Sequence, residues 1–264
     1  MTRHESHGWG AMRRLREGNI AVGNFFFRYR NTIFPTLFVL IALLGRPRVI
    51  LGHPALDRWL VACGTLVALA GQCVRLVTIG YEYIERGGKA GKVYASHLVQ
   101  GGVYALTRNP MYLGNGLIAI GMTMVAGAPL LYVVVLPFFL FVYQALIAAE
   151  EAYLQVTFGA EYARYCALVN RLLPAFGRIR QTLGGLRYDW RSAVRQELST
   201  LAGLLTGLTL LPVWRTYFLE GFDAAKVKAP TALIVELLVL FLYGLLIALK
   251  KRRRLFYPPT DVPG

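Results

Sequence analysis

Six apolar stretches constrain this chain more than any other feature of its sequence. They span residues 32–49, 59–80, 112–126, 131–149, 198–214 and 231–249. A membrane-spanning helix needs about 20 mostly apolar residues, so the third and fourth stretches are short for a straight crossing. With 56% hydrophobic residues overall, the sequence predicts an all-α, polytopic membrane bundle of five to six spans with interfacial helices on the cytosolic side.

The distribution of charge predicts how this bundle is oriented. The chain has 29 Lys and Arg against 14 Asp and Glu, a formal net charge of +15. Most of the basic residues fall on one side of the expected spans, which places both termini and both ends of the 112–149 hairpin in the cytosol. The basic residues are scattered among the spans and form no groove-reading motif. They therefore indicate contact with membrane lipids and no nucleic-acid partner.

Three regions follow from this organisation. Residues 1–80 are expected to form an N-terminal interfacial segment and two anchoring spans. Residues 81–174 contain nearly all the motif-like chemistry and the helical hairpin. Residues 175–264 form an arginine-rich connector, expected on the cytosolic surface, and two C-terminal spans. These last spans could shape a substrate portal, anchor the chain or join two protomers in a homodimer.

The polar segment before the hairpin reads Arg108-Asn109-Pro110. Proline is favoured in the first turn of a helix and asparagine at its N-cap, so this tripeptide is predicted to begin the third span. A helix start attracts anionic groups, and Arg108 adds a full positive charge. Tyr104 and Tyr112 supply flat faces with hydroxyl tips. An ordinary capped helix within an interfacial aromatic belt is the alternative interpretation.

The polar segment after the hairpin begins with Glu150 and Glu151. Two adjacent carboxylates at the C-terminal end of an apolar helix oppose each other and the helix dipole, so they need a cation when they lie against the membrane. A hairpin returns to the side that it left. The two glutamates are therefore expected to meet Arg108 at one membrane face, with Arg108 or a cationic ligand as their partner.

An amphipathic helix is predicted downstream of the acidic pair. Tyr162 and Tyr165 recur at helical spacing, while Glu161 and Arg164 fall on the opposite side. We expect this helix to lie over both ends of the hairpin and to stop at Pro174. The aromatic stripe could be packing or part of a cofactor wall.

Neither histidine nor cysteine indicates a metal centre. His97 has no partner at metal-ligand spacing, and a polar contact in its loop is the expected role. The three cysteines, Cys63, Cys73 and Cys166, show no paired spacing and are expected to be reduced packing residues. We therefore predict no metal site.

The motifs on both sides of the hairpin resemble the isoprenylcysteine carboxyl methyltransferase and phospholipid N-methyltransferase superfamily. The resemblance covers about residues 96–174. It rests on the order, spacing and intervening hairpin of Gly102-x-Tyr104-x-x-x-Arg108-Asn109-Pro110-Met-Tyr112-x-Gly114, Glu150-Glu151, Phe158-Gly159-x-Glu161-Tyr162-x-x-Tyr165 and Arg171-x-x-Pro174. Many members have histidine where Asn109 stands, so no role in proton transfer is carried over to this position.

The resemblance implies an integral membrane enzyme that uses S-adenosyl-L-methionine to methylate a lipophilic acceptor, which could be a lipid amine, carboxylate or thiol. It implies catalytic roles for Arg108, Glu151 and Arg171. We expect the glutamates to hold the ammonium of the cofactor, the helix start its carboxylate and the tyrosines its adenosine. The implied cofactor-binding residues are His97, Leu98, Gly102, Tyr104, Arg108, Asn109, Pro110, Tyr112, Gly114, Glu150, Glu151, Tyr162 and Tyr165.

Two other functions are compatible with the sequence. Sterol and polyprenoid reductases have a similar arginine–proline–tyrosine–glycine hairpin start but use NADPH, whose extra phosphates suit paired glutamates poorly. A non-enzymatic membrane transporter or scaffold is the second alternative. In that case Arg75 in the second span and Glu236 in the last would form a charged pair along a pathway, because charges inside a membrane are functional candidates by default.

Overall fold

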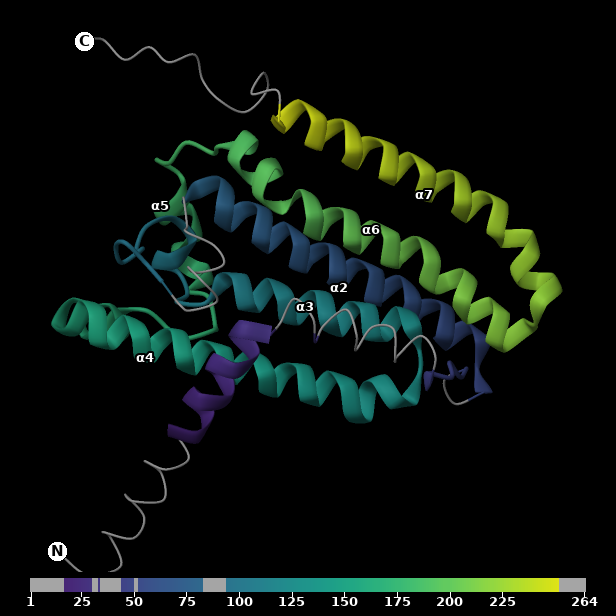
Figure 1. Cartoon of the computed structure of the whole chain (residues 1–264), viewed down its shortest axis with the longest axis horizontal. Coiled ribbons are helices and arrows are strands. Elements are labelled where there is room, and N and C mark those ends of the chain that lie inside the picture. The colour runs from purple at the N-terminus through teal and green to yellow at the C-terminus, as the bar shows by residue number, and fades with distance from the viewer. Residues whose placement is uncertain (1–16, 30–32, 34–43, 50–51, 83–93, 252–264) are drawn as a thin grey trace, which may run out of the picture.

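Figure 1 shows the computed structural model of the chain, which describes residues 17–29, 33, 44–49, 52–82 and 94–251. Every regular element among these residues is helical, which confirms the expected all-α class. Within the described part of the chain, four helices are long and apolar enough to span a membrane, namely Pro54–Tyr81, Leu131–Leu168, Trp190–Glu220 and Phe222–Lys250. A shorter apolar helix covers Pro110–Ala126. Most of the first expected span, 32–49, lies outside the described residues.

The elements follow one another in a simple order. Helix α2 (Pro54–Tyr81) leads through the turn η2 (Gly102–Ala105) to α3 (Pro110–Ala126), and a π-helical turn, η3 (Leu131–Val135), opens α4 (Leu136–Leu168). The short helices η4 (Phe176–Arg178) and α5 (Ile179–Leu183) precede the long pair α6 (Trp190–Glu220) and α7 (Phe222–Lys251). The end of the bundle that holds Tyr81, Pro110 and Trp190 is called the foot end below.

Helix α4 is longer than the sequence predicted. The expected end at residue 149 is wrong, because Glu150 and Glu151 end the apolar run without ending the helix, which continues to Leu168. A single non-helical residue, Gly159 (φ 49°, ψ −115°), kinks it. The predicted amphipathic helix is the part of α4 beyond this kink, and it ends before Pro174.

Glycines allow α2 and α3 to pack closely along one seam. A Cβ added to Gly71 would lie 2.6 Å from the carbonyl oxygen of Gly114, and one added to Gly64 would lie 2.8 Å from that of Gly121. The two glycines on each helix are seven residues apart and therefore share a face. Small residues at such spacing let membrane helices approach backbone to backbone.

The last two long helices form a tight hairpin on the outside of the bundle. Only Gly221, with φ 93°, separates α6 from α7. Helix α6 lies against α2, and α7 lies along the outer side of α6 (Figure 1). No residue in the most apolar window of α7 is buried inside the structure, and its exposed side chains include Leu237 and Phe241. Such a surface fits contact with lipid.

A helix near the N-terminus packs on α4. Residues 17–29 are helical, and Phe27 is buried in a cluster with Val142 and Leu146 of α4. Tyr112 of α3 also packs against this cluster. The N-terminal segment therefore covers the α4 side of the hairpin.

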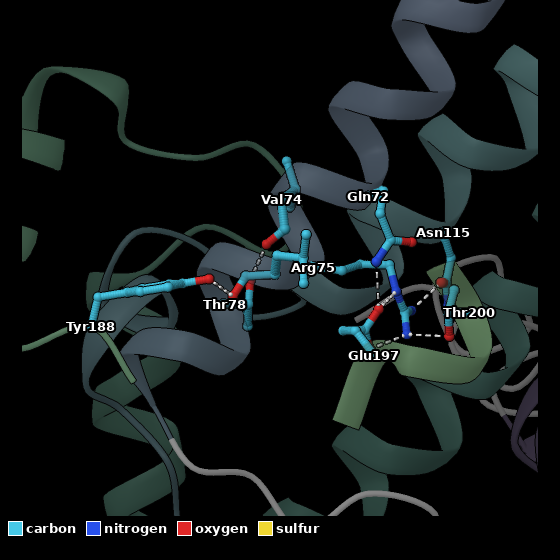
Figure 2. A network of polar contacts seen from close by, with 9 residues as sticks. Gln72, Val74, Arg75, Thr78, Asn115, Tyr188, Glu197 and Thr200 are labelled. Atoms are coloured by element: carbon cyan, nitrogen blue, oxygen red, sulfur yellow. Dashed lines mark hydrogen bonds and ion pairs between the residues drawn. The ribbon is translucent and has the colours of Figure 1, made fainter. Parts of the chain in front are cut away.

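Two charged side chains form an ion pair in the interior of the bundle (Figure 2). Arg75 of α2 pairs with Glu197 of α6, with Nε 2.7 Å from Oε2. The pairing of Arg75 with Glu236, which the transporter alternative implied, is therefore wrong. Glu236 instead accepts a hydrogen bond from Thr206 Oγ1 at 2.8 Å. Glu197 lay just before the predicted fifth span, yet it is completely buried.

Candidate active site

The two polar segments that flank the hairpin meet at the foot end. Arg108, next to the start of α3, lies with its guanidinium nitrogen NH1 3.6 Å from Oε1 of Glu151 on α4. One turn into α3, the hydroxyl of Tyr112 donates a 2.7 Å hydrogen bond to Glu150 Oε1. Figure 1 shows α3 and α4 as the two arms of this hairpin. The meeting expected from the sequence is thus present in the structure.

Hydrogen bonds between the segments around residues 104–109 and 165–175 hold this end together. The backbone N–H of Arg108 donates to the carbonyl of Asn170 at 2.9 Å, and that of Ala175 donates to the carbonyl of Leu106 at 3.0 Å. The hydroxyl of Tyr165 donates to the carbonyl of Tyr104 at 2.8 Å. Backbone bonds on both sides of Arg108 leave its position little freedom.

Glu151 lies between two arginines. Arg171 contacts Oε2 through Nε at 3.0 Å and NH2 at 2.9 Å, while Arg108 approaches Oε1. The remaining nitrogen of Arg171, NH1, donates to Gln144 Oε1 at 3.0 Å. Gln144 precedes Glu151 by seven residues, so both project from the same face of α4. Glu151 is therefore charge-compensated without any ligand.

Two buried polar atoms of this cluster have no hydrogen-bond partner among the described residues. They are Nε of Arg108, a donor, and Oε1 of Glu151, an acceptor. Burial alone would lower the pKa of the Arg108 guanidinium, but the charge of Glu151 and the contact with Cys166 outweigh it and raise the pKa. Because most buried polar atoms in proteins are paired, an unused donor beside an unused acceptor is a feature that a polar ligand can satisfy.

Asn109 occupies the predicted N-cap position of α3 but does not cap the helix with its side chain. Its Nδ2 donates instead to the carbonyl oxygen of Arg171 at 3.0 Å, so the expected capping bond is wrong. Pro110 fills the first helical position, as predicted, and is fully buried. A hydrogen bond from Asn109 to the segment after α4 thus replaces the expected capping bond within α3.

Several aromatic rings lie at the same end of the hairpin as the cluster. Tyr162 and Tyr165 are buried, with ring centroids 6.2 Å apart, on the part of α4 beyond the Gly159 kink. The ring of Tyr112 meets that of Tyr143 edge to face at 5.6 Å. These aromatic side chains belong to α3 and to α4, the helix that carries Glu150 and Glu151.

Four of the predicted cofactor-binding residues lie outside this cluster. His97 is exposed and contacts the hydroxyl of Ser96 at 3.1 Å, and Leu98 is half-buried. Gly102 adopts a φ of 55° against the C-terminal end of α2. Gly114 lies in the seam between α2 and α3. Their cofactor role remains a prediction.

Three residues at the site were not identified from the sequence. Cys166 contacts NH1 of Arg108, and Gln144 binds Arg171. The hydroxyl of Thr107, which is fully buried, lies 3.5 Å from the carbonyl oxygen of Arg171. Gln144 alone had a usable signal, since a polar side chain in an apolar span is a functional candidate.

Comparison with known proteins relates part of the chain to a family. Residues 59–161 match the model of the phospholipid methyltransferase family. No curated protein and no solved structure matches the chain significantly. The matched segment begins in α2 and ends in α4, so it contains Arg108, Glu150 and Glu151 but neither Arg171 nor the α6–α7 pair. The match confirms the resemblance found in the sequence: residues 59–161 are similar to the phospholipid methyltransferase family, which is consistent with the isoprenylcysteine carboxyl methyltransferase and phospholipid methyltransferase superfamily.

Proposed function

We propose that this protein is an integral membrane methyltransferase that transfers the methyl group of S-adenosyl-L-methionine to a lipophilic acceptor at the cytosolic membrane face. One observation carries the proposal. The cluster of Arg108, Glu150, Glu151 and Arg171 assembles at one end of the hairpin and retains an unused buried donor and acceptor. The family match supports the methyltransferase class over the NADPH-dependent reductase alternative.

The chemistry of these two atoms fits the amino-acid part of the donor. Its carboxylate would accept a hydrogen bond from Nε of Arg108, and its ammonium would donate to Oε1 of Glu151. Bonds of this kind are charge-assisted and roughly twice as strong as neutral ones. Glu150, oriented by Tyr112, would supply a second carboxylate for the ammonium. Tyr162 and Tyr165 would bound the adenosine.

When bound, the donor supplies a methyl group that its sulfonium has already activated. The residues of this chain then need to hold the donor, align it with the acceptor and exclude water. Such positioning contributes roughly 7–11 kcal/mol to a reaction barrier. Neither His53 nor His97, the histidines that the structure describes, lies in the cluster. This favours an acceptor atom that is unprotonated at neutral pH, such as a carboxylate, a thiolate or a weakly basic amine.

The orientation of the bundle supports a cytosolic site. Lys250 at the end of α7 donates to the carbonyl of Arg195 at 3.4 Å, so this end of α7 lies beside the start of α6. The connector itself joins the foot end, where the backbone N–H of Asp189 donates to the carbonyl of Gly80 at 2.7 Å. Basic residues concentrate on the cytosolic side of membrane proteins, and here they concentrate beside the candidate site.

Donor binding tests the proposal directly. We expect the purified protein in detergent to bind S-adenosylhomocysteine, and Glu151→Ala to bind it at least about tenfold more weakly, because hydrogen bonds to charged groups contribute about 1.5–3 kcal/mol. Glu161→Ala is the matched control, since this exposed glutamate of α4 accepts a hydrogen bond from Gln100 at 2.7 Å, away from the arginines of the cluster. Equal affinity of Glu151→Ala and the parent protein would remove the donor role of Glu151. Binding of NADPH in place of the nucleoside would favour the reductase alternative.

The acceptor is identified by a second experiment. The protein in vesicles is incubated with donor carrying a labelled methyl group and a total membrane lipid extract. We expect the label in a lipid fraction, and its chemistry distinguishes an amine, a carboxylate and a thiol. Donor binding without labelling of any lipid would overturn the lipophilic acceptor. Solute uptake by donor-free vesicles would favour the transporter alternative.

A further inference from the structure

We propose that Glu197 of α6, which lies outside the matched segment, is a positioning residue for the candidate active site. It neutralises Arg75 inside the bundle, so that Arg75 can hold Asn115 and fix the start of α3 against α2. The effect on donor binding rests on the proposed function. The effect on the geometry of the site does not, and the two are tested separately below.

The ion pair is buried and geometrically well formed (Figure 2). Arg75 contacts both carboxylate oxygens of Glu197, through Nε and NH2, each at 2.7 Å. Gln72 donates a further hydrogen bond to Glu197 Oε2 at 3.0 Å. The relative exposure is 3% for Arg75 and 0% for Glu197. Two parallel N–H···O bonds of this type fix the orientation of both side chains.

The depth of the pair makes the counter-charge necessary. Arg75 precedes the end of α2 at Tyr81 by six residues, and Glu197 follows the start of α6 at Trp190 by seven. At a rise of about 1.5 Å per residue, the pair lies about 10 Å from the foot end. A charge at this depth in a membrane protein is costly unless it is paired. Without Glu197, the guanidinium of Arg75 would have to move or draw water into the bundle.

Arg75 connects the pair to α3. Its NH1 donates to Oδ1 of Asn115, and its NH2 lies 3.4 Å from Oγ1 of Thr200 on α6. Its aliphatic stem covers Gly114, where an added Cβ would lie 2.6 Å from Cγ of Arg75. One guanidinium thus contacts α6 and α3 while its own backbone belongs to α2. Figure 2 shows these side chains converging from the three helices.

The contact with Asn115 reaches the site through a short piece of helix. Asn115 lies between one and two turns after Pro110, and Tyr112 on the same helix binds Glu150. Arg108 precedes the helix directly. A shift of α3 along α2 would therefore move Arg108 and Tyr112 together relative to α4. In this way a residue of the C-terminal region controls the alignment of the site without touching it.

The experiment uses Cys166 as a native reporter of this alignment. Cys166 contacts Arg108, and the other two cysteines of the chain, Cys63 and Cys73, are replaced by serine in the full-length background. The alkylation rate of Cys166 by a maleimide and the kcat and KM for the donor are measured. We compare the background with Glu197→Gln and with Asn115→Ala, which removes the link to α3 but retains the ion pair.

If Glu197 has a positioning role, both variants raise the alkylation rate of Cys166 several-fold. They also raise the donor KM about fivefold while kcat changes much less. Glu197→Asp, which retains the charge, restores most of both values. Glu236→Gln is the matched control, since this glutamate binds Thr206 between α6 and α7, and it leaves both values unchanged.

The proposal is overturned if Asn115→Ala and Glu197→Gln lower the melting temperature but leave the alkylation rate and the donor KM at background values. In that case the pair only stabilises the bundle. If the background protein neither binds nor uses the donor, the proposed function fails, and the alkylation rates still decide whether Glu197 positions the start of α3. If Glu197→Gln does not fold, Asn115→Ala provides the same decision.

Discussion

The molecule contains two arginine–glutamate clusters that use the same chemistry in different surroundings. The outer cluster lies at the foot end and contains Arg108, Glu151 and Arg171. Their side chains are 17%, 21% and 38% exposed, and two of their buried polar atoms have no hydrogen-bond partner among the described residues. The inner cluster, Arg75 and Glu197, lies inside the bundle. The two side chains are 4% and 0% exposed, and both carboxylate oxygens of Glu197 accept hydrogen bonds from Arg75.

The difference between the clusters indicates what each can do. A saturated pair in an apolar surrounding has no capacity left for a ligand, but it holds the helices that carry it in one arrangement. A partly exposed cluster with an unused donor and acceptor contributes less to stability and can change partners when a ligand arrives. Loss of the inner cluster should therefore affect folding first, and loss of the outer cluster should affect donor binding first.

The largest effect on stability is expected when one partner of the inner ion pair is removed. Removing one partner of a buried ion pair costs about 3–5 kcal/mol, because the remaining charge is left uncompensated. We therefore expect Glu197→Leu to lower the free energy of unfolding by about this amount, measured by denaturant or thermal unfolding in detergent. The double variant Arg75→Met/Glu197→Leu removes both charges and should recover most of the loss. A single variant as stable as the parent protein would show that the pair is not formed.

A somewhat smaller effect is expected in the glycine seam that joins the helices of the two clusters. In Gly71→Ala the new Cβ would lie 2.6 Å from the carbonyl oxygen of Gly114, so α2 and α3 must separate. Overpacking of this kind costs about 1–3 kcal/mol. Gly116→Ala is the control on α3, since no atom lies within 4 Å of its added Cβ. Unfolding of both variants in detergent should show a loss of stability only for Gly71→Ala.

The outer cluster could be predicted from the sequence, and the reason lies in the hairpin. Two apolar stretches of similar length bring their flanking residues to the same side, so Arg108 and Glu151 had to be near each other once the helices were assigned. The N-cap bond of Asn109 could not be judged in the same way. Its competitor, the carbonyl of Arg171, is 62 residues away in the sequence and becomes available only through the fold.

The inner cluster could not be predicted. Hydropathy ends a predicted span where charged residues appear, so Glu197 was left outside the predicted span 198–214, although it lies within α6. Arg75 was recognised as an unusual charge inside a span, but only packing could decide whether its partner was Glu236 or Glu197. The same limitation shortened α4, whose helix continues past Glu150. The pattern of apolar residues reports the membrane boundary, and helix ends are set by backbone hydrogen bonds and tertiary contacts.

An intermediate effect on binding is expected from the exposed side of the outer cluster. Arg171→Ala removes both contacts to Oε2 of Glu151 and the bond to Gln144. Because Arg171 is partly exposed, we expect a loss of stability below about 1 kcal/mol. Donor affinity should fall about tenfold, since Glu151 loses its orientation and a hydrogen bond to a charged group contributes about 1.5–3 kcal/mol. Titration with S-adenosylhomocysteine measures this. Arg164→Ala, an exposed arginine on α4, should bind like the parent protein, and equal losses in both variants would contradict a specific role for Arg171.

The smallest effect separates a functional hydroxyl from a structural one at the same end of the bundle. The hydroxyl of Tyr112 donates to Glu150 at 2.7 Å, whereas that of Tyr188 donates to the carbonyl of Leu76 at 3.3 Å, an exposed contact. Tyr112→Phe leaves Glu150 less well oriented, and one hydrogen bond contributes about 0.5–1.5 kcal/mol, so donor affinity should fall roughly two- to tenfold. Tyr188→Phe keeps the ring that packs on Gly80 and should leave affinity unchanged. A comparable loss of affinity in both variants would mean that tyrosine hydroxyls at the foot end act through general stability. In that case the unpaired donor and acceptor atoms of the outer cluster would no longer explain donor binding.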